Sequence, residues 1–516
     1  MSAYKLLIDT NVFIGLEDPK KVDPAYADIV RKCGEHAIDM FVHECALLDI
    51  ARDRDRARRE ISLSKLRKFQ ELKGPKLPDK ATLESLFGPI RKPNDEVDVA
   101  LLYALSLNVV DLLITEDQGI HERVKLTPLG SRVLTAADAL VWLRRTFDPT
   151  PVSFPLIADC KAHEIDISDR MFESLREGYP LFDSWWAKCI AEHRRCWAVT
   201  VGDQLAGLIV RKDETPAEAD VTLPGRKILK ICTFKVRPEF RGEKLGELLL
   251  KQALWYAQRN DYDLIYLTCY AGQVTLIRLL EYYGFMRTCS RADGEMVFEK
   301  PLSRARLATG AAETDLFTLD RTNYPRFVVD APANVYCVPI RGDYHRKLFP
   351  ELAFAAPLPL FPDERPLLSL SARGDRTPGN TIRKVYICRA KTKALKPGDA
   401  LLFYHSKTPG LAASQTVTSI GVVERVSQTS DLEELVRLTA KRSVFSEAEL
   451  RGIVDASPTP VRVIDFLLVG HIDLAIPLSA LAADGVFNGG PPQSICALSP
   501  DRFAPIRERL ALGFAV

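Results

Sequence analysis

The stretch ILKICTFKVRPEFRGEKLGELLLKQALWYA, residues 228–257, predicts a buried strand, a glycine-containing turn and an apolar helix. The strand covers Ile228–Val236, and the turn runs from Arg237 to Gly246. The first N–H groups of a helix have no partner within it, and its dipole is positive at that end. The turn can therefore receive a pyrophosphate, although two glycines alone do not identify a ligand.

A second phrase, EYYGF at residues 281–285, follows this stretch. Together with VRPEFRGEKLGELLL it resembles the GNAT acetyltransferases, and the resemblance covers residues 156–302. It implies a central α+β GNAT fold, N-acetyltransferase activity and acetyl-CoA as cofactor. It also implies that the cofactor is bound by Val236 at the end of the strand and by Arg241, Gly242, Glu243, Lys244, Leu245 and Gly246 of the turn, which grips the pyrophosphate.

Two positions depart from the pattern of this family. Lys244 stands where the family has its middle glycine, and it could contact phosphate or crowd the loop. Leu280 stands where a tyrosine often acts as general acid, while Tyr282 and Tyr283 are out of register and are more often packing residues. Acetyl-CoA binding is therefore better supported than acetyl transfer, and both an enzyme with an unusual acid and an acyl-CoA sensor fit the sequence.

Residues 1–146 alternate apolar strands with helical patterns, which predicts an open parallel α/β sheet. Asp9 ends the strand YKLLI, and Asp117 closely follows the strand LLI at 112–114. Ligands of parallel sheets bind outside the carboxyl ends of the strands, so these two acids should meet. Asp95 and Asp98 share one face of a predicted helix. Converging carboxylates raise each other's pKa values, and Mg²⁺ or Mn²⁺ would relieve the repulsion and support phosphodiester hydrolysis.

The phrases IDTNVFI, DVALLYAL and LLITED, with Glu44 between the first two, resemble the PIN-domain nucleases in order and spacing. The resemblance implies a PIN fold, an RNA substrate and Asn11 or Thr10 as supporting residues. The implied catalytic metal ligands are Asp9, Glu44, Asp98 and Asp117, with Asp95 as a catalytic candidate that could replace Asp98. The basic segment Arg52–Lys68 fits a solvated helix face and a phosphate-contacting arm equally well.

Residues 325–516 combine short strands with frequent Gly and Pro, which predicts a β-rich, barrel-like unit. The phrases LKPGDALLFYHS (395–406) and SIGVVERV (419–426) predict two of its strands. The first phrase resembles PUA-like barrels of the ASCH or EVE kind, which implies binding of RNA or a modified base. Tyr404 is a candidate for stacking on a base. Basic residues that could contact phosphate are Arg383, Lys384, Lys441 and Arg442.

The bulk properties indicate an ordinary cytoplasmic protein of several domains. The chain has 516 residues, 47% of them hydrophobic and 27% charged, and its net charge of +2 does not indicate a partner. Eleven cysteines form no CxxC pair, which argues against disulfides and structural zinc. No signal peptide and no apolar run of about 18 residues are present, so no membrane is expected as a partner. Linkers are predicted at residues 147–155 and 301–324.

Three functions remain open from the sequence. The most economical is a Mg²⁺- or Mn²⁺-dependent endoribonuclease with an acetyltransferase module and an RNA-binding barrel. By analogy, it would act on RNA such as tRNA as a toxin, stress or defence factor, and an inhibitor protein would be a further partner. The second is an N-acetyltransferase of proteins or small molecules with a structural PIN domain. The third is a non-catalytic RNA-binding regulator gated by acetyl-CoA. The oligomeric state cannot be predicted.

Overall fold

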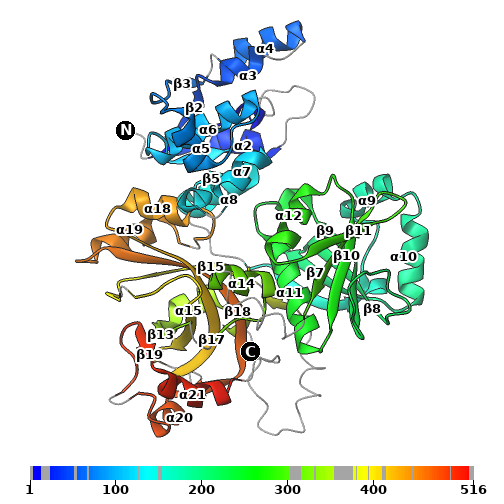
Figure 1. The fold of residues 1–516 in the computed structure, drawn as a ribbon, viewed down its shortest axis with the longest axis vertical. Helices are drawn as coiled ribbons and strands as arrows, with labels where there is room; N and C mark the ends of the chain where they lie inside the picture. The colour runs from blue at the N-terminus through cyan, green and yellow to red at the C-terminus, as the bar shows by residue number, and fades with distance from the viewer. Residues whose placement is uncertain are drawn as a thin grey trace. The chain divides into compact units, whose positions relative to one another are not determined.

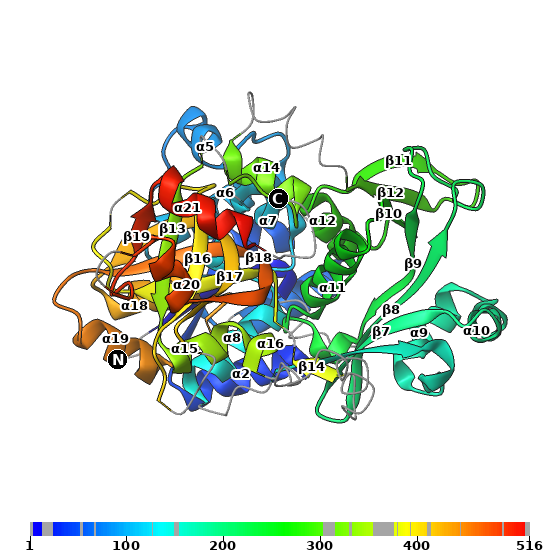
Figure 2. The ribbon, with the colours of Figure 1, turned by 90° about the horizontal axis from the view of Figure 1, so that it is seen from below.

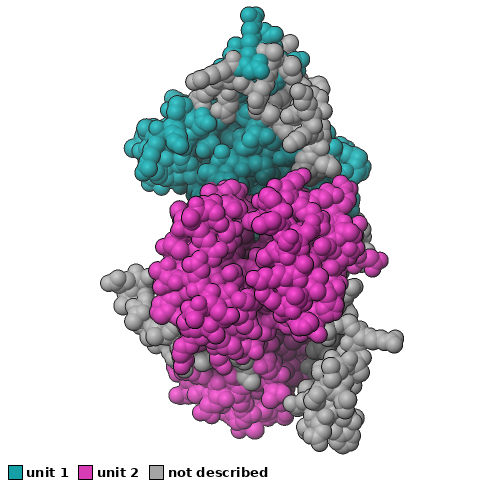
Figure 3. Space-filling view, turned by 90° about the vertical axis from the view of Figure 1, so that its right-hand side faces the viewer, with its two compact units in different colours: residues 1–152, 241–243, 427–463 teal, residues 153–240, 244–426, 464–516 magenta. Residues whose placement is uncertain are grey.

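The computed structural model describes residues 4–12, 24–51, 55–66, 69–125, 127–148, 154–302, 315–329, 333–353, 376–378, 380–392, 394–409, 414–443, 445–487 and 490–510. Parts of both predicted linkers, and residues 52–54 and 67–68 of the basic segment Arg52–Lys68, lie outside the described residues. The chain divides into two compact units (Figure 3). The first unit contains residues 1–152, 241–243 and 427–463, and the second contains residues 153–240, 244–426 and 464–516.

The sheet of the first unit, of which β2, β3 and β5 are labelled in Figure 1, is entirely parallel and has the order β3-β2-β1-β4-β5. Its strands are β1 (Lys5–Ile8), β2 (Asp39–His43), β3 (Gln70–Leu72), β4 (Leu112–Ile114) and β5 (Val133–Leu134). This confirms the predicted parallel sheet. The strands β1, β4 and β5 are short and mostly buried, which suits a sheet covered on both faces, whereas the edge strand β3 is polar and largely exposed. The strand order reverses between β1 and β4, and open α/β sheets bind their ligands at such a point.

Helices connect these strands, and two more helices come from the 427–463 segment. Arg437 on one of those two pairs with Asp111, with Nη1 2.6 Å from Oδ1. The helices are α2 (Pro24–Glu35), α3 (Ala46–Ala51), α4 (Arg56–Leu66), α5 (Lys80–Phe87), α6 (Pro93–Ser106), α7 (Gln118–Val124), α8 (Ala136–Phe147), α18 (Leu432–Thr439) and α19 (Glu447–Asp455).

The second unit contains a sheet of order β11-β12-β10-β9-β8-β7-β6-β14. Its strands are β6 (Leu156–Lys161), β7 (Arg195–Val201), β8 (Gln204–Glu214), β9 (Ile228–Val236), β10 (Leu264–Cys269), β11 (Met286–Ser290), β12 (Met296–Pro301) and β14 (Arg376–Pro378). The accompanying helices are α9 (Glu173–Gly178), α10 (Phe182–Ala191), α11 (Leu245–Arg259) and α12 (Val274–Tyr282). Only β9 and β10 pair in parallel, while their other neighbours are antiparallel.

The same unit contains a further sheet of order β15-β18-β17-β16-β13-β19, whose inner strands lie side by side in Figure 2. The strands are β13 (Val335–Ile340), β15 (Arg383–Cys388), β16 (Ala400–His405), β17 (Thr416–Thr429), β18 (Val461–Pro477) and β19 (Cys496–Leu498). The helices are α14 (Leu316–Asn323), α15 (Gly342–Leu348), α16 (Pro350–Ala353), α20 (Leu478–Ala483) and α21 (Pro500–Glu508). The predicted β-rich character is confirmed. The described strands do not close a barrel, because β15 and β19 remain the two edges.

One continuous hydrophobic core joins both sheets of the second unit. Trp197 on β7 and Leu249 on α11, and Phe403 and Phe466 from the other sheet, belong to the same cluster of buried side chains. The first unit has its own core around Leu7, Leu101 and Leu113. Among the described residues, no helix is long and apolar enough to span a bilayer.

Candidate functional site

The quoted strand, turn and helix form β9, a short 3-10 turn over Pro238–Phe240 and α11. Gly242 has φ 86° and Lys244 has φ 57°, both in the left-handed region. A lysine there costs about 1 kcal/mol relative to glycine, so the turn keeps a glycine-like backbone despite the substitution. Leu245, by contrast, is buried as a packing anchor at the first residue of α11. Because the first N–H groups of a helix have no partner within the helix, the start of α11 is a position at which an anion could bind.

The strands β9 and β10 form a fork beside this turn. Their parallel pairing runs from Ile228↔Leu264 to Ile231↔Leu267. Strand β9 continues to Val236, and its other edge stays paired with β8 up to Gly207↔Val236. From Cys232 to Val236, the edge facing β10 is therefore outside the parallel ladder. A strand edge of this kind offers backbone groups to an extended amide chain such as the pantetheine arm of acetyl-CoA.

The residues around the predicted general-acid position are packing residues. Leu280 and Tyr283 are fully buried, and Tyr282 is nearly so. The guanidinium groups of Arg321 and Arg383 lie over the Tyr282 ring at 4.5 and 5.1 Å from its centroid. This agrees with the expectation that these tyrosines pack rather than donate protons.

A cluster that sequence reasoning missed lies at the carboxyl end of β10. The rings of Tyr179 and Tyr270 are 5.8 Å apart, and the Tyr179 hydroxyl is 3.5 Å from Oε1 of Glu295. Burial, together with the Glu295 charge, raises the pKa of Tyr179 to about 12. Three distant segments supply these side chains, so no local motif identifies them. Ser174 on α9, five positions before Tyr179, accepts a hydrogen bond from Lys235 on β9 at 2.6 Å, so this segment contacts both arms of the fork.

In the first unit, Asp9 lies where β1 and β4 meet. Its backbone N–H donates to the Ile114 carbonyl at 3.0 Å, and its carboxylate accepts from the Thr115 hydroxyl at 2.5 Å. The Asn11 amide donates to the same hydroxyl at 3.4 Å, and the Thr10 backbone N–H donates to Asp9 Oδ1 at 2.6 Å. Asp9 is only 6% exposed, so its orientation is fixed by this network.

The structure brings Asp98 and Asp117 to the same place. Burial, and then the charges of Asp117 and Asp9, raise the pKa of Asp98 to about 7. Asp117 also caps α7, because its Oδ1 accepts from the backbone N–H groups of Gly119 and Ile120 at 2.6 and 3.1 Å. Three acids from β1, α6 and the β4–α7 turn thus converge at the point where the strand order reverses.

Asp95 is placed differently. Its Oδ2 accepts from the backbone N–H groups of Arg91 and Lys92, which stabilises the start of α6, and its Oδ1 lies 2.9 Å from Arg123 Nη2. The two backbone hydrogen bonds lower the pKa of Asp95, and the Arg123 contact lowers it further. Asp95 therefore serves the helix start, while Asp98, three residues later, faces the other acids.

Glu44 lies in the turn between β2 and α3, is exposed, and accepts from the Gly74 backbone N–H at 3.0 Å. It is not among the charges that raise the pKa of Asp98. In the described ranges, no three His, Cys, Asp or Glu side chains are grouped so as to hold a metal ion. The four predicted ligands are therefore not assembled into one shell.

Several predicted RNA contacts in the C-terminal part are wrong. Tyr404 is 1% exposed beside Phe403, because both faces of β16 are covered and a bulge interrupts the alternation between these two residues. Arg383 is paired with Glu424. Lys384 is buried, and its Nζ donates to the Leu348 carbonyl at 2.8 Å. Burial lowers the pKa of Lys384 to about 7. Lys441 and Arg442 are half-buried just after α18.

The burial of Tyr404 gives a testable prediction. Tyr404→Ala should lower the free energy of unfolding by about 3–5 kcal/mol, because it leaves a large cavity in the core. Tyr404→Phe should change it by less than about 1.5 kcal/mol, because the ring is retained. Urea unfolding followed by circular dichroism measures both values. An unchanged stability of Tyr404→Ala would contradict the packing role.

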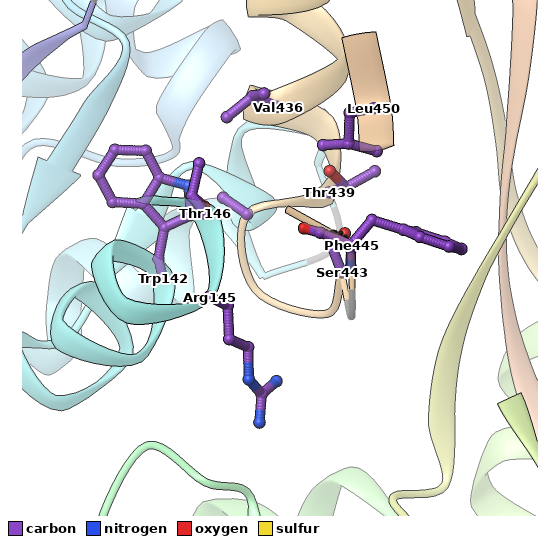
Figure 4. Close-up of a pocket in the computed structure, with 9 residues that line it drawn as sticks. Trp142, Arg145, Thr146, Val436, Thr439, Ser443, Phe445 and Leu450 are labelled. Carbon is purple, nitrogen blue, oxygen red and sulfur yellow. Dashed lines mark hydrogen bonds between the residues drawn. The ribbon is translucent and has the colours of Figure 1, made fainter. Parts of the chain in front are cut away.

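A small cavity in the first unit carries no chemistry that suggests catalysis. Its lining is mostly apolar, with Arg145 as its charged member, and comes from α8 and from the segment that holds α18 and α19 (Figure 4). The lining residues are Trp142, Arg145, Thr146, Val436, Thr439, Ala440, Ser443, Phe445 and Leu450. The acidic cluster and the β9–β10 fork are therefore the two candidate sites.

Comparison with known proteins finds a match to a family model. The model described as "Acetyltransferase (GNAT) family" matches residues 161–285. No curated protein matches the chain. Similar solved structures include a mutant ZmASCH protein from Zymomonas mobilis, with 14% identity, 33% of this chain and 93% of that chain covered, and a TM-score of 0.23. An IAA acetyltransferase from Bacillus cereus has 14% identity over 29% of this chain and 99% of that chain, with a TM-score of 0.23. NAA60 from Arabidopsis thaliana, in complex with a bisubstrate analogue, has 16% identity over 28% of this chain and 97% of that chain, with a TM-score of 0.23.

Proposed function

Because residues 161–285 form an acetyltransferase domain of the GNAT family, we propose that the protein transfers the acetyl group of acetyl-CoA to an amine. The observation that carries the proposal is the fork beyond Ile231↔Leu267, which lies next to the phosphate-binding start of α11. The edge of β9 would pair with the pantetheine arm, and the turn of residues 241–246 would hold the pyrophosphate.

The transfer needs a proton acceptor as well as a bound thioester. The amine nitrogen forms a bond to the acetyl carbon, the carbon–sulfur bond breaks, and the proton lost by the amine balances the one gained by the CoA thiolate. Glu295, beside Tyr179 and Tyr270 at the end of β10, is the carboxylate placed to accept the amine proton. Glu295 would thus act as a general base, and it does not replace the general acid of the family, whose position is occupied by Leu280.

Acetyl-CoA binding and turnover test the proposal separately. We expect calorimetry to show binding of acetyl-CoA to the full-length protein, and a thiol reagent to detect CoA release with an amine acceptor. The acceptor panel should contain a lysine peptide, a polyamine and an aminoacyl-tRNA. Absence of acetyl-CoA binding would contradict the proposal. Binding without CoA release for any acceptor class would instead favour an acyl-CoA sensor.

We also propose a Mg²⁺- or Mn²⁺-dependent ribonuclease site in the first unit. It is supported by the convergence of Asp9, Asp98 and Asp117 and by the raised pKa of Asp98, since a cation would remove their mutual repulsion. Asp9, Asp98 and Asp117 would hold the ion once their side chains move closer together, because in the described residues no three such side chains are grouped to bind a metal, and Glu44 would also have to move to join them. A bound ion would lower the pKa of a water molecule and stabilise charge on a phosphoryl oxygen.

The nuclease is tested on total RNA. We expect cleavage with Mn²⁺ or Mg²⁺ and none with excess chelator, and mapping the new ends would identify the target. If the protein leaves RNA intact with either metal, the reading as a protein or small-molecule acetyltransferase with a structural N-terminal domain gains support. RNA binding by the C-terminal sheet is part of the same proposal, but Tyr404, Arg383 and Lys384 cannot supply its contacts.

A further inference from the structure

The helix that begins at the phosphate turn carries an unusual polar face. Glu247, Lys251, Trp255 and Arg259 recur every four residues along α11, so they lie on one side of the helix. Glu247 and Lys251 are 8% and 2% exposed. Charged side chains are rarely buried without partners, so this face needs partners from elsewhere in the chain.

The first partner holds the turn of helix directly after the phosphate loop. Oε1 of Glu247 accepts a hydrogen bond from the backbone N–H of Arg383 on β15, at 2.6 Å. Glu247 immediately follows Gly246, whose N–H belongs to the predicted phosphate site. The orientation of this first turn is therefore tied to a strand of the C-terminal sheet.

The second partner is a buried carboxylate on α16. Nζ of Lys251 lies 2.5 Å from Oε1 of Glu351, which also accepts from the Asn380 backbone N–H at 3.0 Å. Burial alone would raise the pKa of Glu351, but the Lys251 charge and the neighbouring His471 bring it well below its ordinary value. A buried pair with this geometry fixes the distance between the two elements, because separating the charges is costly.

The remaining partners continue along the same face. Nε1 of Trp255 donates to the Tyr324 hydroxyl at 2.8 Å, and the Trp255 ring packs edge-on against His471 at 5.6 Å. Arg259 pairs with Asp473 at 3.0 Å, and this last pair is largely exposed. The partners Arg383, Glu351, Tyr324, His471 and Asp473 all come from residues 324–473, outside the segment that matches the acetyltransferase family.

We propose that Glu351 is a positioning residue for acetyl-CoA binding: through Lys251 it holds α11 so that the first-turn N–H groups point at the pyrophosphate. The C-terminal sheet is thus part of the cofactor site without touching the cofactor. This inference rests on the proposed use of acetyl-CoA. It assigns a role in acetyl transfer to a domain whose resemblance suggested only RNA binding.

Glu351→Gln tests the role in the full-length protein, because it removes the charge and nearly keeps the shape. We expect the Kd for acetyl-CoA, measured by calorimetry, to rise about tenfold. The Kd for S-acetylpantetheine, which has no pyrophosphate, should stay within about twofold. The double variant Lys251→Met/Glu351→Met should regain most of the acetyl-CoA affinity, because packed apolar side chains often replace a buried ion pair without loss. Arg259→Gln, which breaks the exposed pair at the other end of the face, is the matched control and should bind like the wild type.

The outcomes separate this role from general structural support. If folded Glu351→Gln binds acetyl-CoA like the wild type, or loses affinity equally for both ligands, the positioning role is wrong. If Glu351→Gln does not fold, Glu247→Ala removes the other contact and should show the same selective loss. Wild-type protein that fails to bind acetyl-CoA would overturn the proposed function itself, whereas normal wild-type binding with unaffected variants would overturn only the positioning role.

Discussion

Lys244→Glu is expected to weaken acetyl-CoA binding by about a hundredfold, or about 2.7 kcal/mol. Lys244 is the N-cap of α11 at the turn proposed to hold the pyrophosphate, and the substitution replaces an attractive charge with a repulsive one. Its backbone, with φ 57°, is equally available to both side chains, so the effect should be electrostatic. Calorimetry at low salt measures it, and the difference should shrink at high salt because exposed charges are screened.

Two further substitutions separate charge from backbone conformation. Lys244→Gly removes the charge but relieves the left-handed strain, so it should weaken binding only about tenfold while raising stability by about 1 kcal/mol. Arg226→Glu makes the same charge change at a side chain that is 94% exposed, before β9, and should leave binding unchanged. If Lys244→Glu binds as tightly as the wild type, the phosphates do not lie at this turn.

Asp98→Asn is expected to reduce metal-dependent RNA cleavage by at least about a hundredfold while making the metal-free protein more stable at pH 8. The pKa of Asp98 is about 7 in the folded protein, against an ordinary value of 3.8. The folded state therefore holds a proton that the unfolded chain releases between these two values. The titration of Asp98 therefore has no effect on the free energy of unfolding below about pH 4, lowers it as the pH rises to 7, and lowers it by a constant amount above that.

The neutral amide of the Asp98→Asn variant does not ionise, so the loss of stability caused by the buried Asp98 charge disappears. Because the carboxyl is only partly buried, we expect a gain of about 1–2 kcal/mol above pH 7 and none at pH 4, measured by urea unfolding. Asp95→Asn is the matched control, three residues away on the same helix. The free energy of unfolding of this variant should fall by about 1 kcal/mol, because the start of α6 and the pair with Arg123 are weakened. The variant should still cleave RNA. Equal cleavage by Asp98→Asn and the wild type would remove Asp98 from the proposed site.

Features that depend on neighbouring residues were determined by the sequence alone. Ile228–Val236 and the helix after it follow from apolar periodicity. The parallel sheet of the first unit follows from short apolar runs between helical segments. Asp9 and Asp117 were placed correctly for the same reason, because the end of a parallel strand fixes the edge on which an acid lies.

Only tertiary contacts decided the rest. Helical spacing puts Asp95 and Asp98 on one face of the helix. The Asp95 carboxylate, however, accepts hydrogen bonds from the backbone N–H groups of Arg91 and Lys92. Alternation in β16 predicted one outward ring, whereas long-range packing covers both faces and buries Tyr404. The sequence predicted α11 only as an apolar helix, whereas its buried Lys251 and Glu247 are paired with Glu351 and Arg383, which lie far along the chain. Local sequence patterns predict where strands and helices form. The partners of buried polar groups come from segments far apart in the sequence, so spacing along the chain does not predict them.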